Sequence, residues 1–361
     1  MKLTELDHLP AGLLEKPASA LYQQLSGPTL IQLPGRNRKP LFISVLQHGN
    51  EDSGWEALRR LLKSHYRHDV LPRPLIIFIG NVLAARHRLR RLEDQPDFNR
   101  CWPGGDEVDT EYSALFQRVH DIVVERQPIA CIDVHNNSGL NPHYAAINRI
   151  RSDYLRLASM FSPQVVYFTM PRGTLSLSLS RHFPSLTLEC GQAGEVHGTD
   201  HSLGFLETCL HLEDISNEKV DADEVHLFHM VATVRVREDI LFGFGGVPSD
   251  LQLRNQLDEF NFCELPTGTS LGVIRPGVAQ PLIATDSAGQ DVTDHYFSFD
   301  RNEVKTVREI MPSMLTHDRR VIRQDCLCYL MERIHYEDYE EIAGPDVLPE
   351  AIQRTDTPGS G

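Results

Sequence analysis

Short runs of apolar, β-branched residues alternate with stretches of helical periodicity along the first 220 or so residues. The apolar runs predict buried strands at Leu41–Leu46, Leu75–Ile79, Ile129–Val134, Val165–Phe168 and Leu186–Leu188. Apolar positions at helical spacing predict helices at Trp55–Tyr66 and Thr110–Gln127. This alternation is typical of an α/β fold, with a mostly parallel mixed sheet and helices on both of its faces.

The pattern changes after about residue 220, where short β-like pieces are separated by turns such as the glycine-rich stretch 242–246. This change predicts a smaller β-rich C-terminal domain. We therefore expect four segments: an N-terminal extension (1–34), an α/β domain (35–220), the β-rich domain (221–340) and a flexible tail (341–361). The tail is rich in Pro, Thr and Gly, which do not favour a packed core.

Polar clusters follow three of the predicted strands at the point where each strand ends. His48 and Glu51 follow the first strand, Asp133 and His135 close the third, and Glu189 follows the last. Ligands of open α/β sheets bind beyond the carboxyl ends of the strands, so we expect these side chains to converge on one site.

The three clusters together supply the ligands of a catalytic zinc ion. Two histidines and one carboxylate leave an open position on zinc for water, and His48, Glu51 and His135 form such a set. Glu189 is the candidate base that takes the proton of the bound water. Asp133 lies two residues before His135 and could accept the ring N–H of a ligand histidine. We expect one Zn²⁺ per chain.

Five segments in a fixed order resemble the succinylglutamate desuccinylase and aspartoacylase branch of the zinc carboxypeptidase superfamily. They are H-G-N-E at 48–51, G-N-x-x-A at 80–84, D-x-N-R at 97–100, D-x-H at 133–135 and L-E-x-G at 188–191. Val82 stands where the family has a proline, and the residues after Glu189 do not match either named enzyme closely. The acyl group and the amino acid of the substrate therefore stay open.

The resemblance implies a zinc-hydrolase catalytic domain over residues 35–220 and roles for three further polar residues. Asn99 and Arg100 would bind a carboxylate of the substrate. Asp and Asn in such a segment can instead brace a loop through hydrogen bonds. An arginine shortly before the D-x-N-R segment would polarise the scissile carbonyl group. Arg90 and Arg91 both fit this position, and Arg91 is preferred.

Composition narrows the class of partner. The formal charge of −15 disfavours nucleic acids and anionic membranes, because both are bound through basic patches. No apolar run approaches the roughly 18 to 20 residues that span a bilayer. The seven scattered cysteines favour reduced thiols and a cytoplasmic protein over a disulfide framework. The oligomeric state, including a homo-oligomer, stays open.

The function indicated by these patterns is hydrolysis of the amide bond of a small, anionic N-acyl amino acid. One alternative is a metallocarboxypeptidase that removes C-terminal residues from peptides, which requires a wider cleft. A second alternative, from another class, is a zinc-containing binding protein without catalysis. Such a protein would be expected to lack the base, whereas Glu189 is present.

Overall fold

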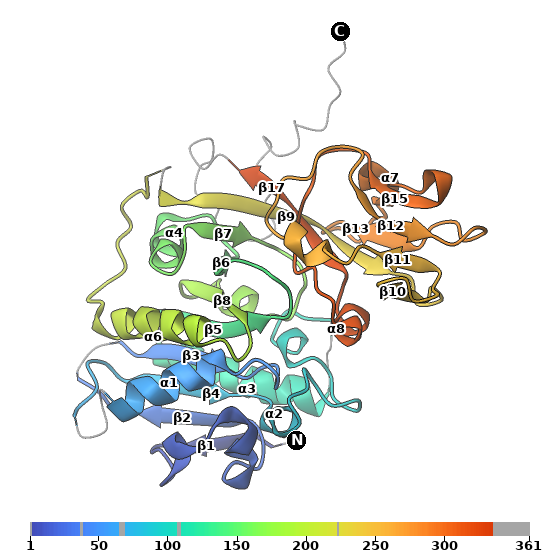
Figure 1. The fold of residues 1–361 in the computed structure, drawn as a ribbon. Helices are drawn as coiled ribbons and strands as arrows, with labels where there is room; N and C mark the ends of the chain where they lie inside the picture. The colour runs from blue at the N-terminus through green and yellow to red at the C-terminus, as the bar shows by residue number, and fades with distance from the viewer. Residues whose placement is uncertain (1, 37–38, 65–68, 107–109, 222–223, 335–361) are drawn as a thin grey trace. The chain divides into compact units, whose positions relative to one another are not determined.

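The computed structural model describes residues 2–36, 39–64, 69–106, 110–221 and 224–334. The chain folds into two compact units (Figure 1). The first unit contains the described residues as far as Asn136, the segment His143–Leu227 and Ile334, and the second contains Asn137–Pro142 and Phe228–Arg333. The predicted tail at 341–361 lies outside the described residues, and the predicted limits at 34, 220 and 340 stay predictions.

The first unit is built on a mixed sheet. Its strands are β1 (Thr4–Leu6), β2 (Thr29–Leu33), β3 (Leu41–Val45), β4 (Leu75–Ile79), β5 (Ala130–Asn137), β6 (Tyr144–Ile147), β7 (Gln164–Tyr167) and β8 (Ser185–Gln192). Their order across the sheet is β1-β2-β4-β3-β5-β8-β6-β7. β3 runs parallel to both β4 and β5, whereas β2 is antiparallel to β4 and β6 is antiparallel to β8. The predicted fold class and all five predicted strands are confirmed; β1, β2 and β6 were not predicted.

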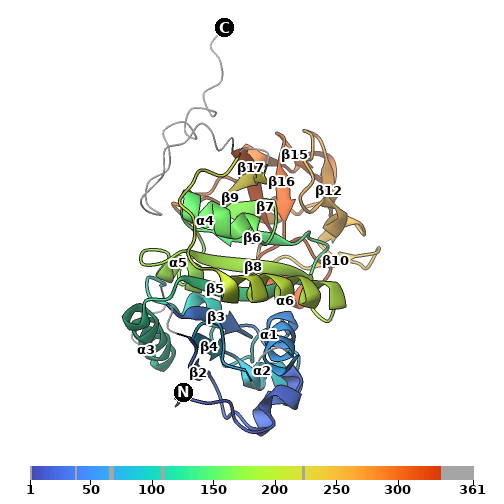
Figure 2. The same ribbon diagram turned by 90° about the vertical axis from the view of Figure 1, so that its left-hand side faces the viewer.

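Helices cover both faces of this sheet, with α1 and α6 on one face and α3 on the other (Figure 2). The helices of the first unit are α1 (Ser53–Ser64), α2 (Val82–Arg86), α3 (Glu111–Arg126), α4 (Ser152–Ser159), α5 (Leu175–Leu179) and α6 (Val196–His211), with 3₁₀ turns η1 (Leu13–Glu15), η2 (Ala18–Gln23) and η3 (Phe98–Arg100). Both predicted helices are present as α1 and α3, although the end predicted at Tyr66 lies outside the described residues. The side chains of Thr110 and Ser113 cap α3 reciprocally, which explains its sharp start.

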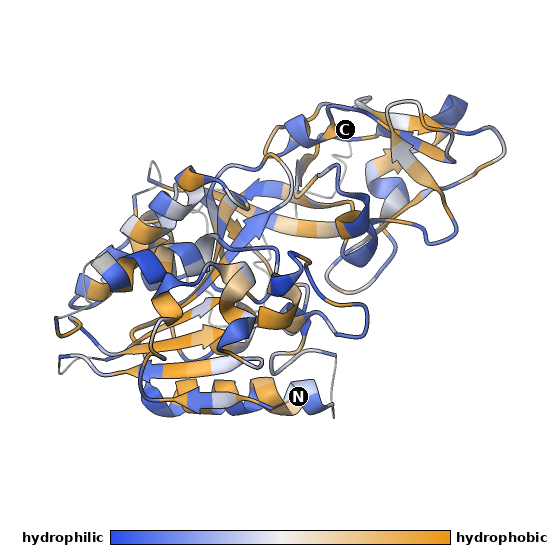
Figure 3. Cartoon of the chain, turned by 60° about the horizontal axis from the view of Figure 1, so that its bottom comes forward, coloured by the Kyte–Doolittle hydropathy of each residue, from blue (hydrophilic) through white to orange (hydrophobic). Residues whose placement is uncertain are grey.

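Alternation along the strands divides the apolar side chains between two cores. Ile43 of β3 and Ile132 of β5 join the core under α1 and α6, whereas Phe42 and Cys131 join the core under α3. Figure 3 shows the apolar positions concentrated in the central strands. Because successive side chains of a strand point to opposite faces, the polar residues of β5 that follow Cys131 at even spacing lie on the α3 face.

The second unit is β-rich, as predicted. One group of strands joins β9 (His226–Val236) to β13 (Leu282–Thr285) and, in the order β9-β17-β16, to β17 (Cys328–Ile334) and β16 (Met311–Ser313). The other is a five-stranded sheet of β10 (Phe242–Phe244), β11 (Leu251–Leu253), β12 (Ser270–Ile274), β15 (Glu303–Thr306) and β14 (Phe297–Ser298). Helices α7 (Thr293–Tyr296) and α8 (Arg319–Gln324) and the 3₁₀ turns η5 (Leu257–Phe260) and η6 (Asp300–Asn302) complete the unit.

Among the residues that the structure describes, no helix combines the length and the apolar character needed to cross a bilayer.

Candidate active site

The H-G-N-E segment forms a buried loop between β3 and α1. A side chain on Gly49 would place its Cβ only 2.2 Å from the backbone nitrogen of Ala85 in α2, so only glycine lets the two backbones approach this closely. The Gly49 N–H donates to the carbonyl oxygen of Arg90 at 3.0 Å. These two contacts fix the direction in which His48 and Glu51 leave the loop, and both side chains are buried.

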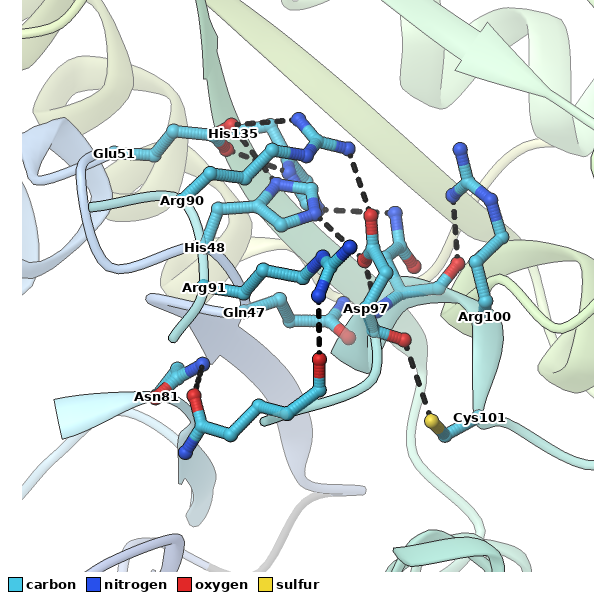
Figure 4. A network of polar contacts seen from close by, with 12 residues as sticks. Gln47, His48, Glu51, Asn81, Arg90, Arg91, Asp97, Arg100, Cys101 and His135 are labelled. Atoms are coloured by element: carbon cyan, nitrogen blue, oxygen red, sulfur yellow. Dashed lines mark hydrogen bonds and ion pairs between the residues drawn. The ribbon is translucent and has the colours of Figure 1, made fainter. Parts of the chain in front are cut away.

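His48, Glu51 and His135 converge on one point (Figure 4). The Nδ1 atom of His48 lies 2.8 Å from Oε1 of Glu51, and Nδ1 of His135 lies 2.8 Å from Oε2 of the same carboxylate. One atom from each residue lies within 4.8 Å of the others, which is compatible with a shared metal ion. The three residues that the sequence predicts as ligands are therefore brought together from β5 and the loop after β3.

The second nitrogen of each imidazole faces another carboxylate. Nε2 of His48 lies 2.9 Å from Oδ1 of Asp97, and Nε2 of His135 lies 2.8 Å from Oδ2 of Asp133. An ionised carboxylate can only accept, so each Nε2 carries the proton and donates it. The opposite nitrogen, Nδ1, faces a Glu51 oxygen in each histidine, so by the same argument it carries a proton in the metal-free protein and could bind a metal once that proton is lost. This is the arrangement in which carboxylates orient metal-binding histidines.

The buried charges also fit a divalent cation. Glu51, Asp97 and Asp133 bring three negative charges and Arg90 brings one positive charge, so two negative charges remain when both imidazoles are neutral. Burial lowers the pKa of His135, yet Asp133 and Glu51 outweigh it and raise that pKa well above its usual value. In the metal-free protein, protons bound to the two imidazoles therefore offset the excess negative charge. Zn²⁺ would take the place of these protons.

Glu51 is held in its ionised form. Burial acts to raise the pKa of this carboxyl, but the neighbouring His48 and His135 outweigh burial and the pKa falls below its usual range. A carboxylate must be ionised to bind a metal, so Glu51 has the charge state that a ligand requires.

Glu189 behaves differently from Glu51, although both are buried. Leu188 and Cys190 of β8 join the core under α1 and α6, so Glu189 between them points to the opposite face, the face of His135. Burial, reinforced by Glu51 and opposed by His135, His48 and Arg90, raises the pKa of Glu189 to about 7. A carboxyl group with this pKa can both take up and release a proton near neutral pH.

Arg90, and not Arg91, has its side chain among these groups. Arg90 is buried, with Nη2 3.0 Å from Oδ2 of Asp97 and Nη1 3.6 Å from Oε1 of Glu51. The Arg91 side chain instead donates hydrogen bonds to the backbone carbonyl groups of Leu92 and Gln95. This geometry favours Arg90 over the preferred Arg91 as the arginine that serves the site.

The D-x-N-R segment caps and forms η3, where the predicted substrate residues make hydrogen bonds within the protein. Oδ1 of Asn99 accepts from the N–H of Leu175 in α5 at 3.2 Å, and Nδ2 lies 3.5 Å from Nε2 of His135. Arg100 donates from Nη1 to the carbonyl oxygen of Asn99 at 2.8 Å. These hydrogen bonds brace the loop, as the alternative interpretation of this segment predicts. Binding of a substrate by Asn99 and Arg100 stays a prediction.

Comparison with protein families matches residues 37–214 to the succinylglutamate desuccinylase/aspartoacylase catalytic domain. Residues 37–214 belong to this family. The matched segment contains all five motifs and every residue of the converging group. The family is hydrolytic, which supports an enzyme with deacylase activity. A comparison with curated protein sequences gives no match.

Several solved structures share the fold of the chain. Succinylglutamate desuccinylase from Chromobacterium violaceum is 16% identical, with a TM-score of 0.53 over 83% of this chain and 86% of that chain. Succinylglutamate desuccinylase/aspartoacylase from Rhodobacter sphaeroides is 17% identical, with a TM-score of 0.53 over 84% and 88%. The ectoine utilization protein EutE (DoeB) from Ruegeria pomeroyi, in a product-bound structure, is 14% identical, with a TM-score of 0.54 over 84% and 88%.

Two residues that contact the converging group in this desuccinylase/aspartoacylase domain, Asp97 and Arg90, are not assigned these positions by the sequence alone. Asp97 was recognised only as part of the D-x-N-R motif, and its contact with His48 spans 49 positions of the chain. Arg90 was ranked below Arg91. The available signal for Asp97 was its residue type, because a carboxylate is the usual partner of a metal-binding histidine.

Proposed function

We propose that the protein is a zinc-dependent hydrolase that cleaves the amide bond of a small N-acyl amino acid. The convergence of His48, Glu51 and His135 inside the family's catalytic domain carries this proposal. These residues would hold one Zn²⁺ per chain, with a coordination position left open. Bound zinc would act as a Lewis acid that polarises the substrate carbonyl group and acidifies a water molecule.

The remaining residues supply proton transfer and charge. Glu189 takes a proton from the attacking water and delivers it to the leaving nitrogen, a task suited to a carboxyl whose pKa is about 7. Asp97 and Asp133 hold the Nε2–H groups of His48 and His135 and keep Nδ1 free for the metal. Each of these functions is performed by a side chain that the fold already orients.

Arg90 stabilises the negative charge that develops on the carbonyl oxygen during hydrolysis. Its guanidinium group is buried and held by Asp97, so little reorganisation is needed when charge develops beside it. We assign this role to Arg90 in place of Arg91 because the Arg90 side chain contacts Glu51 and Asp97, whereas the Arg91 side chain donates to backbone carbonyl groups.

The adjacent arginines provide a matched pair of variants. Arg90→Lys keeps a positive charge but loses the planar fork, so we expect kcat to fall by about 10², the usual effect of losing one charge-stabilising donor. We expect Arg91→Lys to change kcat by less than about 3-fold, since the ordinary effect of a substitution outside the site is small. Steady-state kinetics on zinc-loaded protein measures both. A larger fall in kcat for Arg91→Lys than for Arg90→Lys would assign the role to Arg91.

The expected substrate is small and anionic, with its carboxylate bound by Arg100 and Asn99. Guanidinium binds carboxylates through two parallel hydrogen bonds, and Arg100 is only partly buried. The charge of −15 makes nucleic acids and anionic membranes poor partners. The described residues include all seven cysteines and join none of them in a disulfide, which supports a reducing compartment such as the cytoplasm.

A turnover screen tests the function directly. N-acetyl, N-succinyl and other N-acyl amino acids are compared with short peptides, each with metal-free protein and with added zinc. We expect zinc-dependent release of a free amine from at least one N-acyl amino acid. Cleavage of peptides alone would favour the carboxypeptidase alternative, and zinc binding without any turnover would favour the binding protein.

A further inference from the structure

A chain of buried hydrogen bonds leads from Trp102 to His135. Nε1–H of Trp102 donates to Oε1 of Gln47 at 2.7 Å, and Nε2–H of Gln47 donates to Oδ2 of Asp133 at 2.5 Å. The same Oδ2 accepts from Nε2–H of His135 at 2.8 Å. The donors of Trp102 and Gln47 point toward Asp133, and His135 donates to the same carboxylate oxygen from the other side, because Trp can only donate and the carboxylate can only accept.

All four side chains lie in the interior, where such contacts are strong. Gln47 and Trp102 are each 1% exposed, Asp133 is fully buried and His135 is 3% exposed. Within the described residues, the other carboxylate oxygen of Asp133, Oδ1, has no hydrogen-bond partner. Gln47 is therefore one of the two donors that fix the rotation of the Asp133 carboxylate. Loss of either donor would leave this oxygen partly unpaired in the interior, which is costly. The carboxylate would then be free to turn toward other donors.

The Trp102 ring also packs as an ordinary core aromatic. Its centroid lies 5.7 Å from that of Phe78 and 5.0 Å from that of Phe116, in the core under α3. Packing requires only an aromatic ring, whereas the contact with Gln47 requires the indole N–H. A phenylalanine at this position separates the two contributions, because it keeps much of the ring contact and removes the donor.

We infer that Gln47 and Trp102 are positioning residues that act through Asp133 to hold His135 in the tautomer and orientation required for zinc. The inference rests on the proposed function, since it takes His135 as a zinc ligand. Trp102 orients the amide of Gln47, and this amide directs its N–H at Asp133. Asp133 then keeps the proton of His135 on Nε2 and leaves Nδ1 to the metal.

The chain contains two tryptophans, which offers a matched control. Trp55 is also 1% exposed, and its Nε1–H donates to the carbonyl oxygen of Lys16 at 2.9 Å. Trp102→Phe and Trp55→Phe thus each remove one indole hydrogen bond from the interior. Only Trp102→Phe breaks the chain that leads to His135. Gln47→Leu breaks the same chain one step closer to the metal.

The zinc dissociation constant is measured by competition with a chromophoric chelator. We expect it to rise about 10-fold or more in Gln47→Leu, within the range known for residues that support metal ligands, and less, about 3- to 10-fold, in Trp102→Phe, which acts one step further from the metal. We expect it to stay within about 2-fold of the parent in Trp55→Phe, where no such support is lost. If the indole N–H of Trp102 only stabilised the fold, the zinc dissociation constant would change to the same extent in both tryptophan variants.

The indole N–H signals give a second measurement on the unsubstituted protein, which covers the case in which Gln47→Leu does not fold. In a ¹H–¹⁵N spectrum, the Trp102 signal is identified by its loss in Trp102→Phe. We expect this signal to move when zinc binds, while the Trp55 signal stays in place.

The outcomes separate the inference from the proposed function. A parent protein that binds zinc, with unchanged dissociation constants in Gln47→Leu and Trp102→Phe and an unmoved Trp102 signal, overturns the inference and leaves the zinc site intact. A parent protein that binds no zinc overturns the proposed function, and the inference with it.

Discussion

Replacement of His135 by alanine is expected to remove most of the zinc from the purified protein and to abolish turnover. The unsubstituted chain should carry about one zinc per molecule, because His48, Glu51 and His135 supply three ligands and one position remains open. Loss of Nδ1 of His135 leaves two protein ligands and also breaks the hydrogen bond to Asp133. Metal content by plasma mass spectrometry and turnover of the best substrate measure the two effects.

His143 provides the control for this experiment. It packs against His197 and His201, with ring centroids 4.9 and 4.6 Å away, in a histidine cluster that shares no residue with the converging group. We expect His143→Ala to retain zinc. Retention of zinc in His135→Ala, together with its loss in His143→Ala, would move the metal site to this second cluster. We expect His135→Ala to keep the circular dichroism spectrum of the parent. The predicted zinc ligands project from a sheet that has hydrophobic cores of its own, so folding does not depend on the metal.

Glu189→Gln is expected to lower kcat by roughly 10² to 10⁴ while zinc content stays near one, the range usual for losing a general base. Glutamine keeps the size of the side chain and can form hydrogen bonds, but it cannot accept a proton at neutral pH. Because Glu189 lies on the face of His135 without belonging to the converging ligand group, its replacement should separate proton transfer from metal binding.

Glu51→Gln makes the same chemical change, from carboxylate to amide, at an expected zinc ligand. Glu51 contacts Nδ1 of both histidines, so its amide variant should lose zinc and turnover together. Equal zinc loss in both variants would make Glu189 a ligand. A parental rate in Glu189→Gln would assign the base to another residue. Circular dichroism of each variant must match the parent for these comparisons to hold.

The sequence by itself determined the centre of the fold and predicted which three residues, His48, Glu51 and His135, converge in it. The apolar runs that became β3, β4 and β5 are too short for helices and too apolar for exposed strands, so their burial followed from composition. Polar residues directly after such strands were then expected at one edge of the sheet. The sequence alone therefore predicts that His48, Glu51 and His135 lie together.

The tertiary structure alone decided which neighbouring side chains serve that group. Arg90 and Arg91 are adjacent and chemically identical, and only packing around their loop directs Arg90 toward Asp97 and Glu51. Asp97 meets His48 across 49 positions, and no local pattern encodes such a contact. Gln47 and Trp102, 55 positions apart, are joined by one hydrogen bond in the same way. Side-chain direction in a loop depends on contacts with distant segments, whereas strand burial depends on residues nearby in the sequence.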